Sequence, residues 1–318
     1  MRVALVTNAG PGRGNRTTVD RWVEFVRRAE IEVLLPGAPP RVPPDVVDGY
    51  HAAHGGPWAL ELARRFRVPL VVNLGGTDVF APGVEPVLLA ADCVTGAFPA
   101  FGEMLRVRLG RAVPYAVVPR GVRVPATLPL RAPTGRVLLP AGLRPVKDVL
   151  TAIDLLGRLR ARGLPLSLSI LGPAIDAAYA ATVRARAGAF VEVGETEPDR
   201  MPDAYLAADV VWNTSLHEGG SNALLEAVAY GCAIFARDVP GNRELLGEEG
   251  APGALFDPAD TDSAEAFHRA LLEEDEAARG RRVAAGRAWL RRLHDPTAES
   301  HALENLWSTV DLRNLRMS

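Results

Sequence analysis

The sequence of 318 residues contains little cysteine and no long apolar run. Its two cysteines, Cys93 and Cys232, lie in short apolar stretches typical of strands, so we expect buried thiols of a cytoplasmic protein rather than a disulfide. No apolar stretch approaches the roughly 20 residues that a membrane-spanning helix needs. We therefore expect no integral membrane segment.

An excess of one charge is also missing, since 36 basic residues stand against 38 acidic ones. A nucleic-acid-binding surface needs clustered positive charge, so we expect no nucleic-acid partner. The His-Glu-x-x-His motif of zinc peptidases and the Gly-x-Ser-x-Gly motif of α/β-hydrolases are absent as well. These absences leave zinc chemistry and hydrolase chemistry without support.

Short apolar runs alternate with helical patterns along the chain, which is typical of an α/β fold with parallel sheets. Two such series are separated by a proline-rich stretch that ends near Thr134. We predict two Rossmann-like domains at 1–125 and 135–295, and a last helix over 296–318 that could return to the first domain. Because ligands bind outside the carboxyl ends of parallel strands, the two sheets are expected to face a central cleft that holds the site.

The segment 215–231 carries the clearest chemical signal. Glu226 is the only charged residue of a predicted helix over 222–230, and a helix that is apolar on all sides is buried. A buried carboxylate needs a partner, which the hydroxyl groups of a ligand would supply; a salt bridge to Arg243 is the structural alternative. Glu218, earlier in the segment, is expected at the mouth of the same site.

Two glycines and a helix start separate these acids. Gly219 and Gly220 let the backbone approach a ligand closely, and Ser221 is expected at the helix N-cap. Asn222 lies one helical turn before Glu226 on the same face of the helix. The segment therefore predicts a ligand-binding loop that continues into a ligand-binding helix.

Two cations follow the first strand of the second series. Arg144 and Lys147 lie where a helix is expected to begin, and cations at a helix N-terminus oppose the macrodipole. The arrangement indicates a bound diphosphate. The alternative is that Asp148 satisfies both cations as a cap or a salt-bridge partner.

Candidate residues also follow the strands of the first series. The loop with Gly12, Gly14 and Asn15 offers backbone N–H groups to a phosphate or a sugar, with a tight turn as the alternative. It lacks the last glycine of a dinucleotide-binding loop, so we expect no NAD. His51, which we prefer to His54, is expected in the site because it follows the end of a strand and precedes a glycine pair.

Three aspartates near helix starts allow a structural interpretation. Asp78 follows Gly75 and Gly76, and we expect it to cap a helix or to shape the wall of the cleft. Asp260 and Asp262 have the spacing of an Asp-x-Asp metal motif, but they open an amphipathic helix in nearly a capping-box pattern. We therefore expect no metal site.

These motifs resemble the retaining, nucleotide-sugar-dependent glycosyltransferases of family 4, the glycosyl transferases group 1, which have the GT-B fold. The resemblance spans nearly the whole chain and is strongest over 215–231. It implies that Glu218 contacts the donor sugar, that Glu226 binds the ribose hydroxyls, and that Arg144 and Lys147 hold the donor diphosphate.

Other segments fit this family with two departures. Residues 119–122 resemble its hinge segment. The basic pair is more closely spaced than in most members, and Gly75 stands where many members have histidine, which implies the loss of a contact on the acceptor side.

A narrower similarity is to the selenosugar synthases, which are short members of this family. It rests on residues 14–17 with Trp22, on 143–148 and on 215–220. It implies transfer of an N-acetylhexosamine from UDP to selenophosphate. Arg13 and Arg16 would suit such a small anionic acceptor.

The sequence thus predicts a retaining, metal-independent glycosyltransferase that moves a sugar from a nucleotide sugar, with UDP expected, to a small acceptor, and that needs no cofactor. A nucleotide-sugar epimerase and a non-catalytic sugar-nucleotide-binding protein are the alternatives. The predicted catalytic residues are Glu218, His51, Arg144 and Lys147. The predicted donor-binding residues are Gly12, Gly14, Asn15, Arg144, Lys147, Glu218, Gly219, Gly220, Ser221, Asn222 and Glu226.

Overall fold

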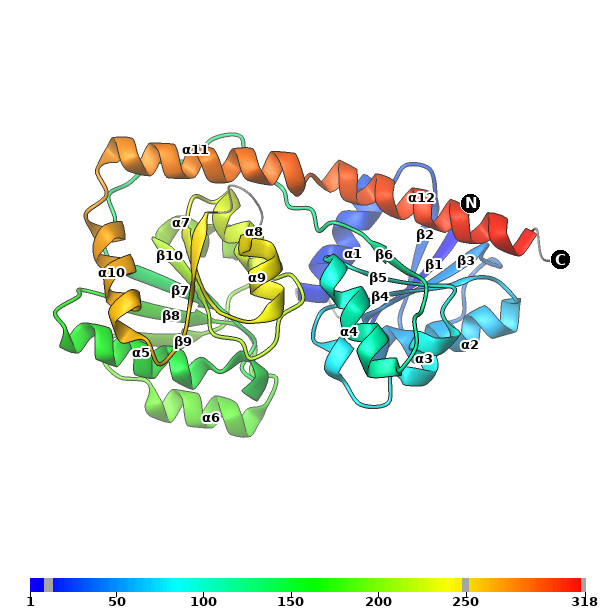
Figure 1. Cartoon of the computed structure of the whole chain (residues 1–318), viewed down its shortest axis with the longest axis horizontal. Coiled ribbons are helices and arrows are strands. Elements are labelled where there is room, and N and C mark those ends of the chain that lie inside the picture. Colours follow the sequence, from blue (N-terminus) through cyan, green and yellow to red (C-terminus); the bar gives the residue numbers. More distant parts are fainter. Residues whose placement is uncertain (9–13, 248–251, 316–318) are drawn as a thin grey trace. The chain divides into compact units, whose positions relative to one another are not determined.

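The structure is a computed structural model that describes residues 1–8, 14–247 and 252–315 (Figure 1). The chain divides into two compact units. We call Met1–Gly121 together with His294–Ser318 the N-terminal unit, and Val122–Leu293 the second unit. Each contains a parallel sheet with helices, and the predicted α/β fold with two Rossmann-like parts is confirmed.

The N-terminal unit is built on six described strands in the order β2-β1-β3-β4-β5-β6. All neighbouring strands are parallel. Their bounds are β1 Arg2–Val6, β2 Glu30–Leu34, β3 Val46–Tyr50, β4 Leu70–Asn73, β5 Cys93–Gly96 and β6 Tyr115–Val117. The chain moves from β1 to one side and then returns to its other side, so the topological switch point of this sheet lies between β1 and β3.

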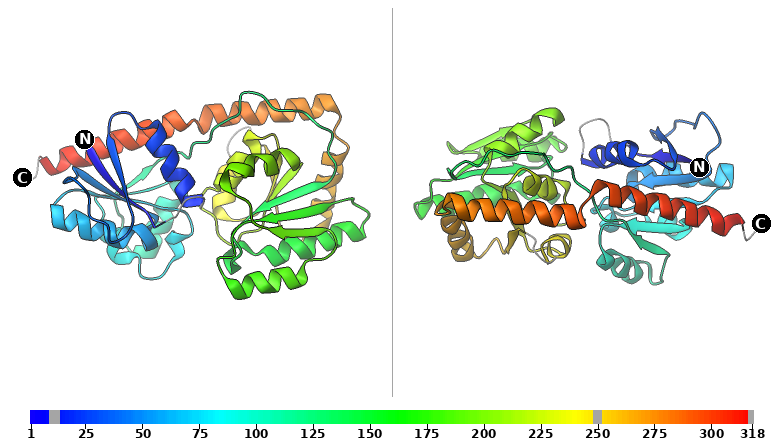
Figure 2. Two further views of the ribbon diagram at one scale, coloured as in Figure 1. Left: turned by 180° about the vertical axis from the view of Figure 1, so that it is seen from behind. Right: turned by 90° about the horizontal axis from the view of Figure 1, so that it is seen from above.

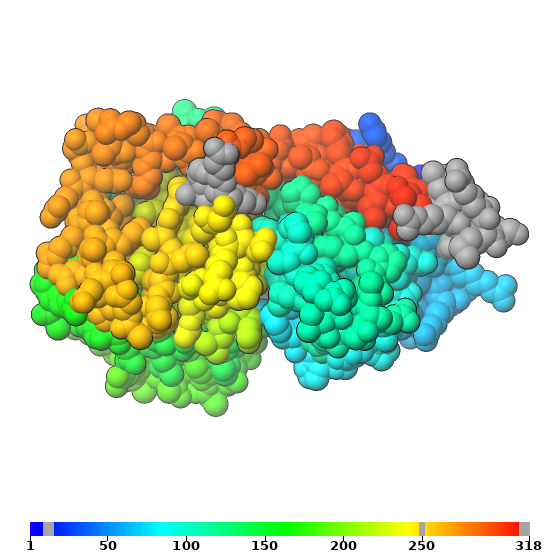
Figure 3. Space-filling model, in the orientation of Figure 1, coloured from blue at the N-terminus to red at the C-terminus, as the bar shows by residue number. Residues whose placement is uncertain are grey.

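The helices of this unit are α1 Gly14–Phe25, α2 Gly56–Phe66, α3 Glu85–Ala90, α4 Pro99–Leu109 and α12 Pro296–Leu315, with a π-helical turn η1 at His51–Gly55 and a 3₁₀ turn η2 at Asp78–Phe80. The last helix, α12, packs beside α1 (Figure 2). A bidentate ion pair between Arg21 and Glu299 joins these helices, and both side chains are buried. In the space-filling view α12, in red, forms part of the surface of this unit (Figure 3).

The core of the N-terminal unit contains a buried carboxyl group. Trp307 of α12 is fully buried and donates its indole N–H to Asp48 Oδ2 at 2.7 Å, and Asn73 Nδ2 donates to Asp48 Oδ1 at 2.5 Å. Burial raises the pKa of Asp48 to about 7, although these two hydrogen bonds act in the opposite direction. This contact fixes the C-terminal helix on the central strand β3.

The second unit has six described strands in the order β12-β11-β10-β7-β8-β9, again all parallel. Their bounds are β7 Arg136–Pro140, β8 Ser167–Leu171, β9 Val191–Gly194, β10 Val210–Asn213, β11 Ala233–Arg237 and β12 Gly253–Phe256. This is the strand order of the dinucleotide-binding Rossmann fold, with the switch point between β7 and β10.

The helices of the second unit are α5 Val149–Ala161, α6 Ala177–Arg186, α7 Met201–Ala207, α8 Asn222–Ala229, α9 Pro240–Gly247, α10 Thr261–Leu272 and α11 Glu276–Leu293, with 3₁₀ turns η3 at Pro145–Lys147 and η4 at Pro198–Arg200. Apolar side chains of the sheet and of α5, α6 and α10 form its main core. None of the described helices is long and apolar enough to cross a membrane.

Candidate functional site

The loops on either side of the second switch point meet through an ion pair. Lys147 lies in the loop after β7 and Glu218 in the loop after β10, and these strands are neighbours. Lys147 Nζ donates to Glu218 Oε1 at 2.6 Å, and the side chains keep only 19% and 8% of their surface exposed. The structure thus brings together two of the predicted catalytic residues at the edge of the sheet where ligands bind.

The two oxygens of Glu218 have different surroundings. Oε1 accepts hydrogen bonds from Asn213 Nδ2 at 3.0 Å and Ser215 Oγ at 2.7 Å, in addition to the bond from Lys147. Oε2 accepts no hydrogen bond from any residue that the structure describes. The carboxylate is therefore held in place through one oxygen, while the other can accept a hydrogen bond from a ligand.

The surroundings keep Glu218 ionised. Burial raises its pKa, but the charge of Lys147 and the hydrogen bonds from Lys147, Ser215 and Asn213 lower it by more. The net result is a pKa below the ordinary value of 4.5. At neutral pH Glu218 is thus a carboxylate, which accepts hydrogen bonds and does not donate them.

The backbone around Lys147 differs from the predicted helix start. Pro145–Lys147 is a 3₁₀ turn, and Asp148 has a left-handed backbone with φ 44° before α5 begins at Val149. Lys147 ends this 3₁₀ turn directly before the N-cap residue, so the cations lie near the helix N-terminus but not in its first turn. The N-cap position is held by an acidic residue, which suits the dipole.

The alternative in which Asp148 pairs with both Arg144 and Lys147 is wrong. Asp148 Oδ2 accepts from Thr151 Oγ1 at 2.8 Å and from Arg237 Nη1 at 2.5 Å. Arg144 is half-buried, and its Nε has neither exposed surface nor a hydrogen-bond partner among the described residues. An anionic ligand would satisfy this donor.

Backbone contacts hold the two loops side by side. Thr214 Oγ1 donates to the Lys147 carbonyl at 2.9 Å, and the Leu216 amide donates to the Val146 carbonyl at 2.9 Å. A Cβ atom at Gly241 in α9 would lie 2.1 Å from the Glu218 carbonyl oxygen, so only glycine allows this approach. The position of Glu218 is therefore set by β7, β10 and α9 together.

The loop after Glu218 leads directly into α8. Gly220 has φ +93°, which favours glycine, and α8 begins at Asn222. Ser221 is at the N-cap position, but its side chain makes no capping hydrogen bond. The Gly219–Ser221 backbone thus turns the chain into the N-terminus of a helix, where backbone N–H groups suit an anion.

Glu226 is half-buried, so the expectation of a helix buried on all sides is wrong. The buried residues of α8 are Leu224, Leu225 and Ala227–Ala229, whereas Asn222 and Glu226 lie along its partly exposed edge. Glu226 Oε2 accepts a hydrogen bond from Tyr205 Oη at 2.8 Å. The suggested partner Arg243 instead forms an ion pair with Asp238.

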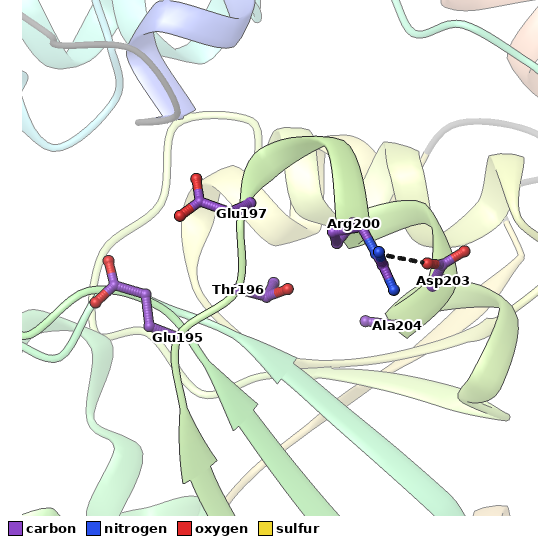
Figure 4. A pocket seen from close by; sticks show the side chains of 6 residues that line it. All are labelled: Glu195, Thr196, Glu197, Arg200, Asp203 and Ala204. Carbon is purple, nitrogen blue, oxygen red and sulfur yellow. Dashed lines mark hydrogen bonds and ion pairs between the residues drawn. The ribbon is translucent and has the colours of Figure 1, made fainter.

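An open cavity of about 710 Å³ lies beside the helix that carries Tyr205 (Figure 4). Its lining comes from the loop after β9 and from the start of α7, and consists of Glu195, Thr196, Glu197, Arg200, Asp203 and Ala204. Tyr205 is buried, and burial raises its pKa, as does the neighbouring Glu226 carboxylate. Tyr205 therefore stays a protonated donor that connects Glu226 to this helix.

In the N-terminal unit, His51 stands at the first switch point with an unusual backbone. It directly follows β3, has φ +72°, and is buried within the turn η1. Its ring stacks on His54 with centroids 4.2 Å apart, and its Nδ1 lies 3.8 Å from Asp78 Oδ2. Positive φ at a residue other than glycine costs free energy and is concentrated at functional sites.

Asp78 shapes this region through backbone contacts. It accepts hydrogen bonds from the amides of Ala52 at 2.7 Å, Gly75 at 3.0 Å and Gly76 at 2.7 Å, and it is fully buried. It thus joins the loop after β4 to the turn that carries His51. No capping hydrogen bond is made at η2, and the expected place of Asp78 in the wall of a cleft stays a prediction.

The remaining predicted residues of the first series have mixed outcomes. Gly12 and Arg13 lie outside the described residues. Gly14 and Asn15 form the first residues of α1. Arg16 forms an ion pair with Asp20 at 2.7 Å on the same helix, so this cation already has a counter-ion.

Other groups have structural roles. Asp260 caps α10 by accepting from the Ser263 amide at 3.0 Å, and Asp262 forms an ion pair with Arg162. Among the described residues no group of three or more His, Cys, Asp and Glu side chains could hold a metal ion. Cys93 and Cys232 are buried thiols, and burial raises the pKa of Cys232 to about 12.

Sequence reasoning missed several residues around these sites. Asn213 and Ser215, which hold Glu218, could have been found from their position at the end of β10. Tyr205 carries no such signal, because it reaches Glu226 from a different helix. Arg120 was assigned only to a hinge, yet its guanidinium is buried in the N-terminal unit.

Comparisons with known sequences agree on the second unit. Residues 135–274 match the family model described as Glycosyl transferases group 1. A segment of 123 residues is 29% identical to Glycosyltransferase 1 domain-containing protein 1 of Xenopus tropicalis. The match covers 37% of this chain and 35% of that relative, so it spans about a third of the relative's length.

Comparisons with solved structures extend over both units. The crystal structure of Anabaena HepE in complex with UDP and glucose has a TM-score of 0.79 at 15% identity, and the match covers 97% of this chain and 100% of that one. Sucrose-phosphate synthase from Thermosynechococcus elongatus has a TM-score of 0.76 at 16% identity, with 97% and 98% covered. These solved structures share the fold of this chain with its two Rossmann-like parts, and the family model matches residues 135–274.

Proposed function

We propose that this chain is a retaining glycosyltransferase that moves a sugar from a UDP-sugar to a small acceptor without a metal ion. The observation that carries the proposal is the ion pair of Lys147 and Glu218 at the switch point between β7 and β10. In this proposal Lys147 would hold the diphosphate, and Glu218 beside it would contact the sugar. The sequence similarity of residues 135–274 to glycosyl transferases group 1 supports the same reaction class.

In this proposal the second unit binds the donor. Glu218 Oε2, which accepts no hydrogen bond from the described residues, would take one from a sugar hydroxyl. Glu226 would bind the ribose hydroxyls from the half-buried edge of α8, with Tyr205 fixing its carboxylate. The open cavity along α7 would take the base.

The leaving diphosphate would be stabilised by positive charge and N–H groups. Lys147, Arg144 with its unpartnered Nε, and the amides of Gly219–Ser221 are the groups available for this. Stabilisation of developing charge by preorganised donors is usually the largest catalytic contribution of such a site. The acceptor would attack the face from which the diphosphate leaves, and the departing phosphate would take the acceptor's proton.

We assign the acceptor to the N-terminal unit. His51 would contact the sugar or the acceptor from its turn after β3, whereas Gly14 and Asn15 at the start of α1 stay predicted contacts to a phosphate or sugar of the donor. The domain roles predicted from the sequence, acceptor side for 1–125 and donor side for 135–295, are kept as part of this proposal.

Transfer to selenophosphate is a second candidate, because Arg120 is buried in the N-terminal unit and forms no ion pair with any described residue. Mass spectrometry of the purified chain with a panel of UDP-sugars, each with selenophosphate, thiophosphate or sugar acceptors, tests both candidates. The proposal predicts free UDP together with a conjugated product. An isomerised UDP-sugar would indicate an epimerase, and binding of UDP without turnover of any pair would indicate a non-catalytic binding protein.

A further inference from the structure

The N-terminal unit buries a second cation whose hydrogen bonds are incomplete. Arg120 follows β6 and is only 8% exposed. Its Nη1 donates to Thr18 Oγ1 at 3.2 Å and to Tyr50 Oη at 3.0 Å. Both acceptors are uncharged hydroxyl groups, so within the described residues these bonds give Arg120 no counter-ion.

The opposite edge of the guanidinium carries the unused donors. Nε has no hydrogen-bond partner and no exposed surface, and Nη2 makes no hydrogen bond to any described residue. The N–H groups of Nε and Nη2 point the same way and form the fork that binds two oxygens of one carboxylate or phosphate. A buried donor without an acceptor is unfavourable, so this edge is suited to an anion that enters from outside.

Arg21 shows how the Nε/Nη2 edge of a buried guanidinium is normally satisfied, and its partner Glu299 also acts electrostatically on Arg120. Its Nε and Nη2 bind the two oxygens of Glu299 at 2.5 and 2.9 Å. Glu299 is thereby occupied, and the oxygens of Asp78 accept from three backbone amides. Neither carboxylate forms an ion pair with Arg120, although both act on it at longer range.

Arg120 keeps its positive charge in this buried position. Burial lowers its pKa, but Tyr50, Glu299 and Asp78 outweigh burial and raise it above the ordinary value. The side chain therefore presents a permanent positive charge next to Tyr50, the last residue of β3. This position is at the carboxyl end of the sheet, beside His51 and the first switch point, where ligands of such folds bind.

We propose that the Nε/Nη2 edge of Arg120 binds an oxyanion carried by the acceptor, with Tyr50 and Thr18 holding the guanidinium in place. The identification of the ligand as the acceptor rests on the proposed transferase function. The oxyanion site itself rests only on the contacts and burial of Arg120. The earlier candidate Arg16 does not compete for this role, because Asp20 already neutralises it.

Titration calorimetry of the full chain with inorganic phosphate tests the site. The parent carries Arg144→Gln, Lys147→Met and Glu218→Gln, which remove both candidate phosphate-binding cations of the second unit together with its ion pair. Arg120→Gln in this parent is expected to weaken phosphate binding by at least about tenfold. The matched control is Arg106→Gln, because Arg106 is exposed, pairs with Glu103 in the same unit, and should leave the affinity within about twofold.

A second variant covers the case in which Arg120→Gln does not fold. Arg120→Lys keeps the charge but loses the two-pronged geometry, and we expect at least about fivefold weaker phosphate binding with an unchanged circular dichroism spectrum. Acetate in place of phosphate distinguishes a carboxylate-bearing ligand from a phosphoryl-bearing one. Absence of phosphate binding by the parent, or equal affinity in the folded Arg120 variants, would overturn the inference.

UDP binding by the unmodified chain is measured separately. Phosphate binding that depends on Arg120, in a chain that does not bind UDP, would support the oxyanion site and contradict the transferase. UDP binding without Arg120-dependent phosphate binding would contradict the oxyanion site and leave the proposed transferase function supported. The two proposals can therefore fail independently.

Discussion

Charged side chains lie near the switch point of each sheet, but the two units satisfy these charges differently. In the second unit Lys147 and Glu218 neutralise each other across the loops after β7 and β10. In the N-terminal unit Asp78 is satisfied by backbone amides, and Arg120 has donors that find no acceptor among the described residues. The two charges at the second switch point thus neutralise each other, whereas the buried cation near the first has no ion-pair partner in the described part of the chain.

The backbone shows the same contrast. The second switch point uses a 3₁₀ turn and glycines, and side-chain hydrogen bonds from Asn213 and Ser215 complete it. The first uses a π-helical turn that begins with the positive φ of His51. The difference teaches that equivalent edges of related sheets can either pair their charges with each other or keep a cation without an ion-pair partner among the described residues.

The largest expected effect comes from breaking the ion pair. Lys147→Met leaves Glu218 without its cation, and we expect a loss of about 3 kcal/mol in the free energy of unfolding. Transfer should fall by at least about a hundredfold, since the diphosphate loses its principal cation. Urea unfolding and turnover measurements check this, with Lys147→Arg as the control that keeps the charge.

A double-mutant cycle sharpens this test. If the loss comes from the unpaired carboxylate, Glu218→Gln in the Lys147→Met background should restore most of the stability but none of the transfer. Equal unfolding free energies for the single and double variants would contradict the importance of the pair.

Stability of the two units should respond to pH in opposite directions. Asp48 has a folded pKa raised to about 7, so its contribution is fully present below its unfolded pKa near 3.8 and is lost as the pH rises through 7. The lowered pKa of Glu218 gives a contribution that is present above 4.5 and is lost as the pH falls below it.

Replacement of Asp48 isolates the first of these effects. Asp48→Asn should flatten the decline in stability between pH 4 and 8, a decline of up to about 4 kcal/mol in the unmodified chain. Thermal unfolding across this pH range, followed by tryptophan fluorescence because Trp307 contacts Asp48, measures it. Parallel pH profiles for the two proteins would refute the assignment.

Removal of a single carboxylate from α8 should have a smaller, local effect. Glu226→Ala is expected to weaken UDP binding by about tenfold, because the ribose hydroxyls lose a charged acceptor, while Glu218→Ala should mainly reduce turnover. Glu192→Ala is a suitable control, since it removes the same charge from an exposed position of the same unit. Unchanged UDP affinity after Glu226→Ala would exclude the ribose assignment.

The smallest expected effect is that of metal removal. EDTA should leave transfer intact, because the proposed leaving-group contacts are side-chain cations and backbone amides. Asp260 already caps α10, and Asp262 pairs with Arg162. Activity that EDTA abolishes and manganese restores would return both aspartates to consideration as ligands.

Much of the fold could be predicted because the strands are short apolar runs with clear boundaries. The two predicted series of parallel strands and helices, separated before Thr134, are both present. The helices α3 and α9 have weaker signals in the sequence, because α3 is short and α9 begins with Pro240 and Gly241. Their helical conformation depends on tertiary contacts, such as the close approach of Gly241 to the Glu218 carbonyl, which local patterns do not contain.

The candidate site could be predicted in its residues but not in its pairings. Glu218, Lys147 and Glu226 were found because each is a charge in an unusual local context. That Lys147 holds Glu218, and that Tyr205 holds Glu226, depends on residues distant in sequence. Arg120 was missed for the same reason, since only the folded unit shows that its acceptors are two hydroxyl groups.

Calorimetric titration of UDP into the unmodified chain and into Lys147→Met tests the central claim most directly, namely that the second switch point binds a nucleotide diphosphate. We expect the unmodified chain to bind UDP and the variant to bind it at least about tenfold more weakly. Absence of binding by the unmodified chain, or equal affinity in the two proteins, would contradict the account.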